Sequence, residues 1–316
     1  MAQEQQHEGS MPKVYLQCGL RIRSEIEMPL PVVEGDGFDV DVVWSSDRAN
    51  SCDLLTDDVI AEYYDGENVW YQGARLDEGF VVRFPNCGEA TISADLARIE
   101  VHRDPEGVHE VLPILLAGTI SSFLLGLRGE TVLHASAVEV DGTAIVFVGQ
   151  SGRGKTTMAA LMCAHGSRLI TDDVLVVRAG VPTVCLGGAL ELRLREKAAT
   201  LVEGSDEHVT YRTTDDRLAY APEPASVSSL PVGAIVIPSP SHEAGDVVVT
   251  RLAPPEALFT MLGFPRVHGW SDPGVLQRDF ETITAVLNDV PVYEAEIPWG
   301  PPFDPQIAPA IAAILN

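Results

Sequence analysis

Lysine is scarce in this sequence: Lys13, Lys155 and Lys197 are the only lysines among 316 residues. Lysine and arginine together number 21, against 46 aspartates and glutamates, which gives a formal net charge of −25. A chain this acidic repels nucleic acid and anionic membrane surfaces, so we expect no nucleic-acid partner and no membrane partner. Since Lys155 falls inside a glycine-rich motif, we interpret it as a functional residue rather than a solubilising one.

The sequence also lacks a cysteine framework and a secretory signal. Its cysteines are odd in number, widely scattered and without any C-x-x-C pair, which argues against disulfide staples and zinc sites and indicates reduced thiols in a cytoplasmic protein. Residues 1–13 are polar and contain no apolar signal core, so we expect a disordered tail there. The five cysteines are Cys18, Cys52, Cys87, Cys163 and Cys185.

Long apolar runs are rare as well. Residues 111–127 (VLPILLAGTISSFLLGL) carry no charge, but 17 residues are few for a membrane span and the run contains Pro113 and two glycines. The composition favours a buried helix that leads into the following domain and ends near Gly129. There are no internal repeats.

A phosphate-binding motif stands at the centre of what is present. The pattern G-x-x-x-x-G-K-[ST] is met by GQSGRGKTT, after an apolar strand-like run at 144–148 and before a helical run at 156–164 that His165-Gly166 closes. The glycines let successive N–H groups turn toward phosphate oxygens, and the helix N-terminus adds partial positive charge. The alternative is a chance glycine-rich turn. The predicted ATP-binding residues are Gly149, Gln150, Ser151, Gly152, Arg153, Gly154, Lys155, Thr156 and Thr157.

Two adjacent carboxylates, Asp172 and Asp173, lie inside a second apolar run, RLITDDVLVV. Adjacent carboxylates repel each other, so a pair within a strand indicates a cation or a proton-transfer task. The alternative is a solvated turn, for which Thr-Asp-Asp is well suited. Beside a phosphate loop the pair fits a kinase, which needs one acid for Mg²⁺ and one to accept the proton of the attacking hydroxyl.

These motifs together resemble the HPr kinase/phosphorylase family. The resemblance is carried by His134 in LHASAV, the Asp141-Gly142 turn, GQSGRGKTT, the His-Gly helix end and ITDDV. It is closer to the HPr kinase-related branch, which includes kinases associated with lasso-peptide tailoring. It implies Mg-ATP-dependent phosphorylation of a serine hydroxyl on a protein or peptide. It also implies that Asp172 is the general base, with Asp173 beside it and His134 facing the phosphates.

The expected fold class is α/β, with a P-loop core that resembles HPr kinase and the nucleotide domain of PEP carboxykinase. The Asp141-Gly142 turn between apolar runs at 131–140 and 143–148 predicts a hairpin. The strand before the loop therefore has an antiparallel neighbour, and the sheet is mixed. His134 lies on that neighbour, where a packed core histidine and a phosphate-facing one are equally compatible with the sequence.

Further site candidates follow at 185–195, where leucine alternates with charge. Leu190, Leu192 and Leu194 are expected to face the core. The related family carries Glu-x-Arg-Gly here, which implies Glu191 near the metal with Thr156 and Asp173, and Arg193 at a phosphate. Leu194 replaces the glycine, and a solvated strand face is the alternative. Residues 203–217 read as a mobile loop that carries Arg212 and Arg217.

The expected organisation is a tail at 1–13, a β-rich module at 14–104 and a catalytic domain at 105–316. Short strands broken by Gly, Asp and Asn define the β-rich module, whose role is open: it docks substrate or completes the fold. Trp44 and Trp70 are interpreted as its core residues. Helices are expected at 254–262, 279–287 and 305–315.

We therefore expect a cytoplasmic serine kinase that uses ATP and Mg²⁺. The basic C-terminal motif of bifunctional relatives is not found, which favours kinase over phosphorylase activity, and the short chain argues against a PEP carboxykinase. Two alternatives stay open: a kinase for a small-molecule hydroxyl, and a nucleotide-binding regulatory protein without transfer activity. The related family includes hexamers, so a homo-oligomer is compatible with the resemblance.

Overall fold

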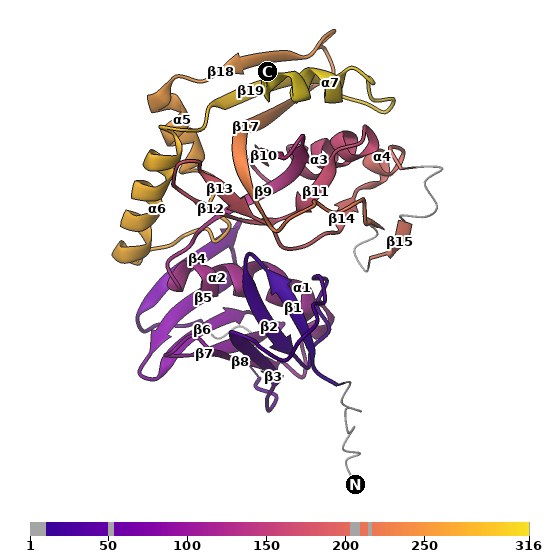
Figure 1. Cartoon of the computed structure of the whole chain (residues 1–316). Helices are drawn as coiled ribbons and strands as arrows, with labels where there is room; N and C mark the ends of the chain where they lie inside the picture. Colours follow the sequence, from indigo (N-terminus) through magenta and orange to yellow (C-terminus); the bar gives the residue numbers. More distant parts are fainter. Residues whose placement is uncertain (1–10, 50–53, 203–208, 214–216, 316) are drawn as a thin grey trace.

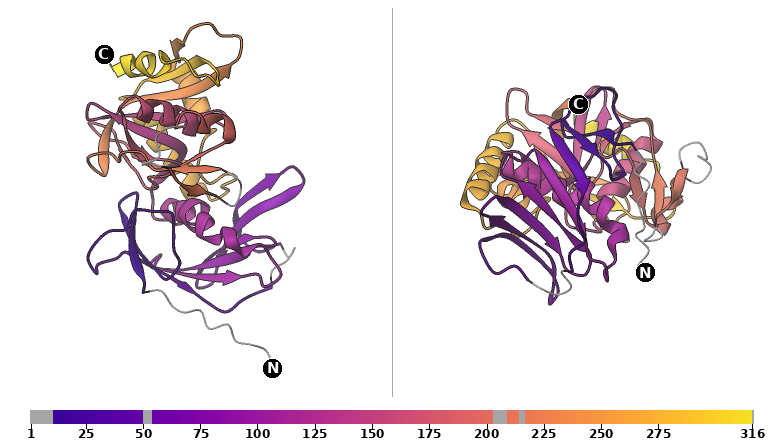
Figure 2. Two further views of the ribbon diagram at one scale, coloured as in Figure 1. Left: turned by 90° about the vertical axis from the view of Figure 1, so that its right-hand side faces the viewer. Right: turned by 90° about the horizontal axis from the view of Figure 1, so that it is seen from below.

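The computed structural model describes residues 11–49, 54–202, 209–213 and 217–315. The expected tail lies outside these residues as far as residue 10, as does Cys52, and the first strand begins at Lys13. The described chain forms two stacked parts, an N-terminal β-rich part and a mixed α/β core (Figures 1 and 2). The α/β expectation is confirmed.

The N-terminal part is an eight-stranded sheet with the spatial order β1-β2-β3-β8-β7-β6-β5-β4. Neighbours pair antiparallel except at β2–β3 and β3–β8, which are parallel. The short strands expected here are present: β1 (Lys13–Gln17), β2 (Leu20–Ser24), β3 (Val40–Trp44), β4 (Val59–Asp65), β5 (Asn68–Leu76), β6 (Gly79–Phe84), β7 (Gly88–Ser93) and β8 (Arg98–Arg103).

The apolar run folds as one helical stretch, His109–Leu127, which lies against this sheet. By length and composition alone it resembles a membrane span, yet 67% of its apolar window is buried inside the protein, so the expected buried helix is confirmed. Gly129, with φ +97°, follows its end as predicted. Its segments are η1 (His109–Val111), α1 (Leu112–Leu115), the π-helical turn η2 (Leu116–Ile120) and α2 (Ser121–Leu127).

The core sheet is mixed and has the order β10-β9-β12-β13-β17-β19-β18, with β11 paired to β9. Strand β17 also pairs with β10 in parallel. The strands β10, β9, β12, β13 and β17 therefore form a closed ring of paired strands. The strands are β9 (Thr131–Val140), β10 (Thr143–Val148), β11 (Arg168–Thr171), β12 (Val174–Arg178), β13 (Val184–Leu186), β17 (Ser229–Ser241), β18 (Val248–Arg251) and β19 (Val292–Pro298).

The predicted hairpin is confirmed. Strands β9 and β10 pair antiparallel from Val140↔Thr143 to Ala135↔Val148. Asp141 and Gly142 both have positive φ, 50° and 78°, as a tight turn between twisted antiparallel strands requires. The strand that feeds the glycine-rich loop is thus flanked by β9 on one edge and β17 on the other.

Helices cover both faces of the core sheet. Helix α3 (Lys155–Ala164) shares one apolar cluster with α7 (Ile307–Ala312) and η3 (Ala313–Leu315), whereas α5 (Pro254–Met261) and α6 (Pro273–Val286) pack on another. Helix α6 begins six residues before the expected 279–287, because the Asp272 side chain accepts from the backbone N–H groups of Gly274 and Val275.

A small third sheet lies beside α3 and holds the order β14-β16-β15. Its strands are β14 (Leu192–Leu194), β15 (Val209–Arg212) and β16 (Leu218–Tyr220), and α4 (Glu196–Ala199) follows β14. The expectation of a loop throughout 203–217 is wrong at β15, since pairing with β16 supplies backbone partners that local polarity does not indicate. Residues 203–208 and 214–216 of that loop lie outside the described residues.

Candidate active site

The glycine-rich loop joins β10 to α3 as the sequence predicts. Strand β10 ends at Val148 and helix α3 begins at Lys155. Gly149, Gly152 and Gly154 have φ values of +153°, +79° and +92°. Side chains other than glycine rarely adopt this region, so the three glycines are required for the path of the loop. A chance turn is therefore a poor description of a loop that uses three such glycines.

Lys155 links the two ends of the glycine-rich loop through side-chain hydrogen bonds. Its side chain is buried, and Nζ donates hydrogen bonds to the carbonyl oxygens of Gly149 (2.8 Å) and Gln150 (3.2 Å). Burial lowers the pKa of Lys155, while the nearby carboxylates of Asp172 and Asp173 act in the opposite direction. The single lysine of the motif thus places its cation between the loop and the acid pair.

Asp172 lies between β11 and β12 and is buried. Its Oδ1 accepts a hydrogen bond from Ser136 Oγ at 2.5 Å, and Thr156 Oγ1 donates to Oδ1 and Oδ2 at 3.0 and 3.1 Å. Burial raises the pKa of Asp172 to about 6, assisted by the charge of Asp173 and opposed by the two hydroxyl donors and Lys155. The solvated-turn alternative is wrong for this residue.

Asp173 faces a different set of partners. It has φ +76°, and its side chain is 42% exposed. Oδ2 accepts from Arg266 Nη2 at 2.7 Å, and Oδ1 lies 3.5 Å from His134 Nε2. Burial acts to raise the pKa of Asp173, but the charges of Arg266 and Lys155 and the hydrogen bond from Arg266 hold it below its ordinary value. The left-handed backbone turns the two adjacent carboxylates toward different neighbours.

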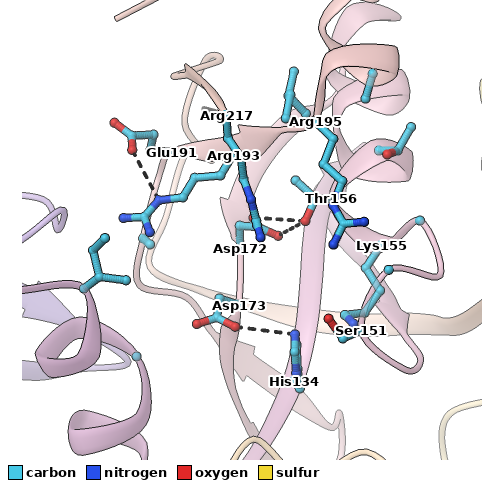
Figure 3. A pocket seen from close by; sticks show the side chains of 18 of the residues that line it. His134, Ser151, Lys155, Thr156, Asp172, Asp173, Glu191, Arg193, Arg195 and Arg217 are labelled. Carbon is cyan, nitrogen blue, oxygen red and sulfur yellow. Dashed lines mark hydrogen bonds and ion pairs between the residues drawn. The ribbon is translucent and has the colours of Figure 1, made fainter. Parts of the chain in front are cut away.

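His134 points toward the acid pair from β9 (Figure 3). Burial lowers its pKa to about 3; Asp173 opposes this, and the cations of Lys155, Arg266 and His268 add to it. The imidazole is therefore neutral at physiological pH. His134 lines the cavity described below, so it is not a packed core histidine, and that it faces the phosphates stays a prediction.

Three arginines reach the same cavity from the segment around the small sheet: Arg193, Arg195 and Arg217 (Figure 3). The predicted alternation at β14 is confirmed, because Leu192 and Leu194 are fully buried whereas Arg193 is half-buried; Leu190, just before the strand, is half-buried too. Glu191 Oε1 lies 3.8 Å from Arg193 Nε and accepts from Tyr211 Oη at 3.2 Å. Arg212 is exposed and does not line the cavity.

The predicted metal ligands are only partly brought together. The carboxylate that contacts the Thr156 hydroxyl belongs to Asp172, while Asp173 binds Arg266 and Glu191 contacts Arg193. Within the described residues there is no group of three or more His, Cys, Asp or Glu side chains that suits a metal. Mg²⁺ does not require such a group, because one or two carboxylates and a hydroxyl beside substrate phosphates suffice. The Thr156 hydroxyl and a carboxylate of the adjacent acid pair therefore fit this ion.

One cavity of about 670 Å³ lies between the two parts of the molecule, and its lining includes His134, Lys155, Thr156, Asp172, Asp173, Glu191, Arg193, Arg195 and Arg217. From the loop, it is lined by Ser151, Gly152, Gly154, Lys155, Thr156 and Thr157, whereas Gly149, Gln150 and Arg153 do not reach it. The opposite wall is apolar and comes from the N-terminal part: Pro29, Trp70, Val111, Ile114 and Leu115. The helix comes close to the acids, since a Cβ added at Gly118 would lie 3.3 Å from Asp173 Oδ2.

The sequence does not predict several residues that lie at this site. Trp70 is 53% exposed and lines the cavity, so its interpretation as a core residue is wrong, whereas Trp44 packs against the N-terminal core as expected. Ser136 carries a usable signal, because it lies two positions after His134 on the same face of β9. Arg266 carries none: it is 93 residues from Asp173 and reaches it only through the fold.

Comparison with known proteins places this geometry in a family context. No family profile matches the chain. Over 52 residues it is 44% identical to an HPr kinase/phosphorylase of Clostridium botulinum, and over 61 residues 36% identical to that of Geobacter sulfurreducens. Over 78 residues it is 32% identical to that of Bacillus pumilus. Over these segments the chain is similar to HPr kinase/phosphorylases. The matched segments cover 16–24% of it and 17–25% of these relatives.

The chain thus spans at most about a quarter of the length of these curated relatives. A solved HPr(Ser) kinase/phosphatase from Coxiella burnetii superimposes on 58% of the chain with a TM-score of 0.29 and 8% identity, covering 93% of that structure. The local sequence similarity is therefore the finding that connects this chain to the family.

Ser136→Ala is expected to lower the free energy of unfolding by about 1.5–3 kcal/mol at neutral pH, the range for a hydrogen bond to a charged group. Ser136 is fully buried and donates to Asp172, whose carboxylate would keep Thr156 as its remaining hydroxyl donor. Urea denaturation of the purified protein measures the change. Ser226→Ala is the matched control, because Ser226 makes an equivalent bond to Glu139 at the surface. Equal stability losses in the two variants would contradict the prediction.

Proposed function

We propose that this chain is a Mg-ATP-dependent kinase that transfers the γ-phosphate of ATP to a serine hydroxyl of a protein or peptide. The observation that carries the proposal is the contact of Asp172 with Thr156, which joins the acid pair to the first turn of α3 directly after the glycine-rich loop. A buried carboxylate and a buried lysine at the mouth of such a loop are the groups that phosphoryl transfer requires.

In this mechanism the loop N–H groups and the N-terminus of α3 hold the phosphates. Lys155 neutralises charge that develops on the transferred group, and the cavity-facing arginines add to that positive field. Bound Mg²⁺, held by Thr156 and a neighbouring carboxylate, would neutralise charge on the β- and γ-phosphate oxygens. Asp172 accepts the proton of the acceptor hydroxyl, and the raised pKa of its carboxylate suits a proton acceptor.

The division of labour between the two acids is the finer part of the proposal. The family resemblance implies Asp172 as base, with Asp173 and Glu191 on the metal side. The Thr156 contact favours a second assignment, in which Asp172 holds Mg²⁺ and Asp173, which is more exposed and lies beside neutral His134, takes the proton. We retain the first assignment, and the variants described in the Discussion separate the two.

A protein or peptide acceptor is supported by the wall opposite the loop. The N-terminal part places Trp70 and Ile114, both accessible, in the same cavity as the acids. A cavity bordered by an exposed tryptophan and a half-buried isoleucine suits residues that flank an acceptor serine better than it suits a small polar metabolite. We propose a cytoplasmic enzyme whose N-terminal part docks the acceptor, for which a ribosomal precursor peptide is one candidate. A homo-oligomer is compatible with this arrangement.

The test is transfer of label from γ-labelled ATP with Mg²⁺, comparing wild type with Asp172→Asn and offering serine-containing peptides and a cell lysate. Label on a peptide or protein that depends on Asp172 is the expected result. Label found only in small molecules would support a metabolite kinase instead. ATP binding without transfer to any acceptor would support a regulatory nucleotide-binding protein and refute the kinase.

A further inference from the structure

Two aromatic side chains, Trp299 and Phe303, stand at the cavity beside the glycine-rich loop, and no step above uses them. Both line the cavity and both are half-buried. Their rings meet edge to face, with centroids 5.4 Å apart and planes at 86°. We propose that this pair is the platform on which the nucleobase of ATP stacks, an inference that rests on the proposed function and deepens it.

The first argument for the platform is the contact between Trp299 and the backbone of the glycine-rich loop. A Cβ added at Gly154 would lie 2.6 Å from Cη2 of Trp299, so the indole packs directly on the loop backbone one residue before Lys155. In such loops the backbone N–H groups hold the α- and β-phosphates and the lysine reaches the β- and γ-phosphates. An aromatic ring in contact with this stretch lies within reach of the nucleoside that follows the α-phosphate.

The second argument is the direction in which the phosphoryl group is transferred. Phosphoryl transfer is roughly in line, so the acceptor and the leaving nucleotide lie on opposite sides of the transferred group. The acids, with the apolar wall of the N-terminal part, mark the acceptor side. Strand β19 and helix α7, between which Trp299 and Phe303 lie in sequence, are on the other side of the core from the N-terminal part (Figure 1). The nucleoside therefore extends from the phosphates toward the rings of Trp299 and Phe303.

The pair is also held rigidly, as a stacking surface requires. The backbone N–H of Trp299 donates to the Ser241 carbonyl at 2.9 Å, and His242 Nδ1 lies 3.1 Å from the Trp299 carbonyl oxygen. The buried side of both rings packs against the apolar cluster under α3 and α7. A fixed aromatic face loses little side-chain entropy when a base stacks on it, and stacking accepts any base because every base has a π-face.

The competing explanation is a structural clamp: Trp299 holds the loop in place and touches no nucleobase. The two explanations differ in one quantity, the affinity for ATP relative to inorganic tripolyphosphate, which has the phosphates and lacks the nucleoside. Loss of a clamp weakens both ligands together. Loss of a stacking platform weakens ATP alone.

The experiment is calorimetric titration of the full chain with ATP and with tripolyphosphate, each with Mg²⁺. Trp299→Leu is expected to weaken ATP about 5- to 150-fold, the range for loss of one base-stacking contact, with tripolyphosphate affinity within about twofold of wild type. Trp299→Phe keeps an aromatic face and is expected to retain most of the preference for ATP over tripolyphosphate. It keeps the test informative if Trp299→Leu does not fold. Phe259→Leu on α5, 76% exposed, is the matched control.

Parallel losses for both ligands, or no loss for either, would overturn the platform and leave the kinase proposal intact. If the wild type binds neither ligand, the inference and the proposed function both fail. Binding with a Trp299-dependent ATP preference but without phosphate transfer would support the platform and refute the kinase.

Discussion

Asp172→Asn is expected to lower kcat by about 10²–10⁴ while nucleotide affinity stays near that of wild type. The amide is close in size to the carboxylate and keeps an oxygen to accept from Ser136 or Thr156, but it does not take up a proton at physiological pH. Steady-state assays with an acceptor found in the labelling experiment measure kcat, and calorimetric titration of ATP measures the affinity separately.

Asp173→Asn is the matched comparison, because it removes the neighbouring carboxylate from Arg266 and His134. If Asp173 lies on the metal side, this variant requires more Mg²⁺ for half-maximal activity and regains activity at high Mg²⁺. The opposite pattern, in which Asp172→Asn is rescued by Mg²⁺ and Asp173→Asn is not, would exchange the two roles. Full activity in Asp172→Asn would remove it from the mechanism altogether.

Lys155→Ala is expected to weaken ATP binding and, in addition, to lower kcat by about 10²–10³, the loss seen when one preorganised donor to developing charge is removed. The amine is buried beside both acids, so its charge acts in a site with little solvent screening. It also ties the loop through Gly149 and Gln150, whose carbonyl oxygens would lose this donor.

Two controls separate charge from loop structure in that variant. Lys155→Arg keeps the cation in a larger, planar group, and we expect it to restore part of the binding and little of the turnover. Lys13→Ala removes an exposed lysine paired with Glu27 and is expected to change neither quantity. Wild-type kcat in Lys155→Ala, in a protein that unfolds at the wild-type temperature, would contradict the role.

Much of the core site was readable because its signals are local. The glycine pattern, the apolar run before it and the helical run after it lie close together in the chain. The three glycines permit the positive φ values that the loop adopts. The Asp141-Gly142 hairpin is equally local, and it places His134 on a strand adjacent to both the loop strand and the acid pair. Strand pairing then brings His134 directly opposite Val174.

The errors arise where a partner is distant in sequence. The prediction of a loop at β15 is wrong because the hydrogen-bond partners of this strand belong to β16. The prediction of Trp70 as a core residue is wrong because an isolated tryptophan in a strand does not indicate which side faces a cavity. Asp172 and Asp173 are indistinguishable in sequence. The left-handed backbone at Asp173 and the approach of Arg266 separate their environments in the fold.

The loop, the hairpin that feeds it, the acid pair and the mixed α/β class could be predicted from sequence, because each follows from short-range sterics, hydrophobic periodicity and charge. Three features required the folded chain: the contact of Asp172 with Thr156, the pairing of Arg266 with Asp173, and the cavity that the N-terminal part shares with Trp299 and Phe303. These contacts depend on how separate elements pack, and packing is set by long-range burial that no local window contains.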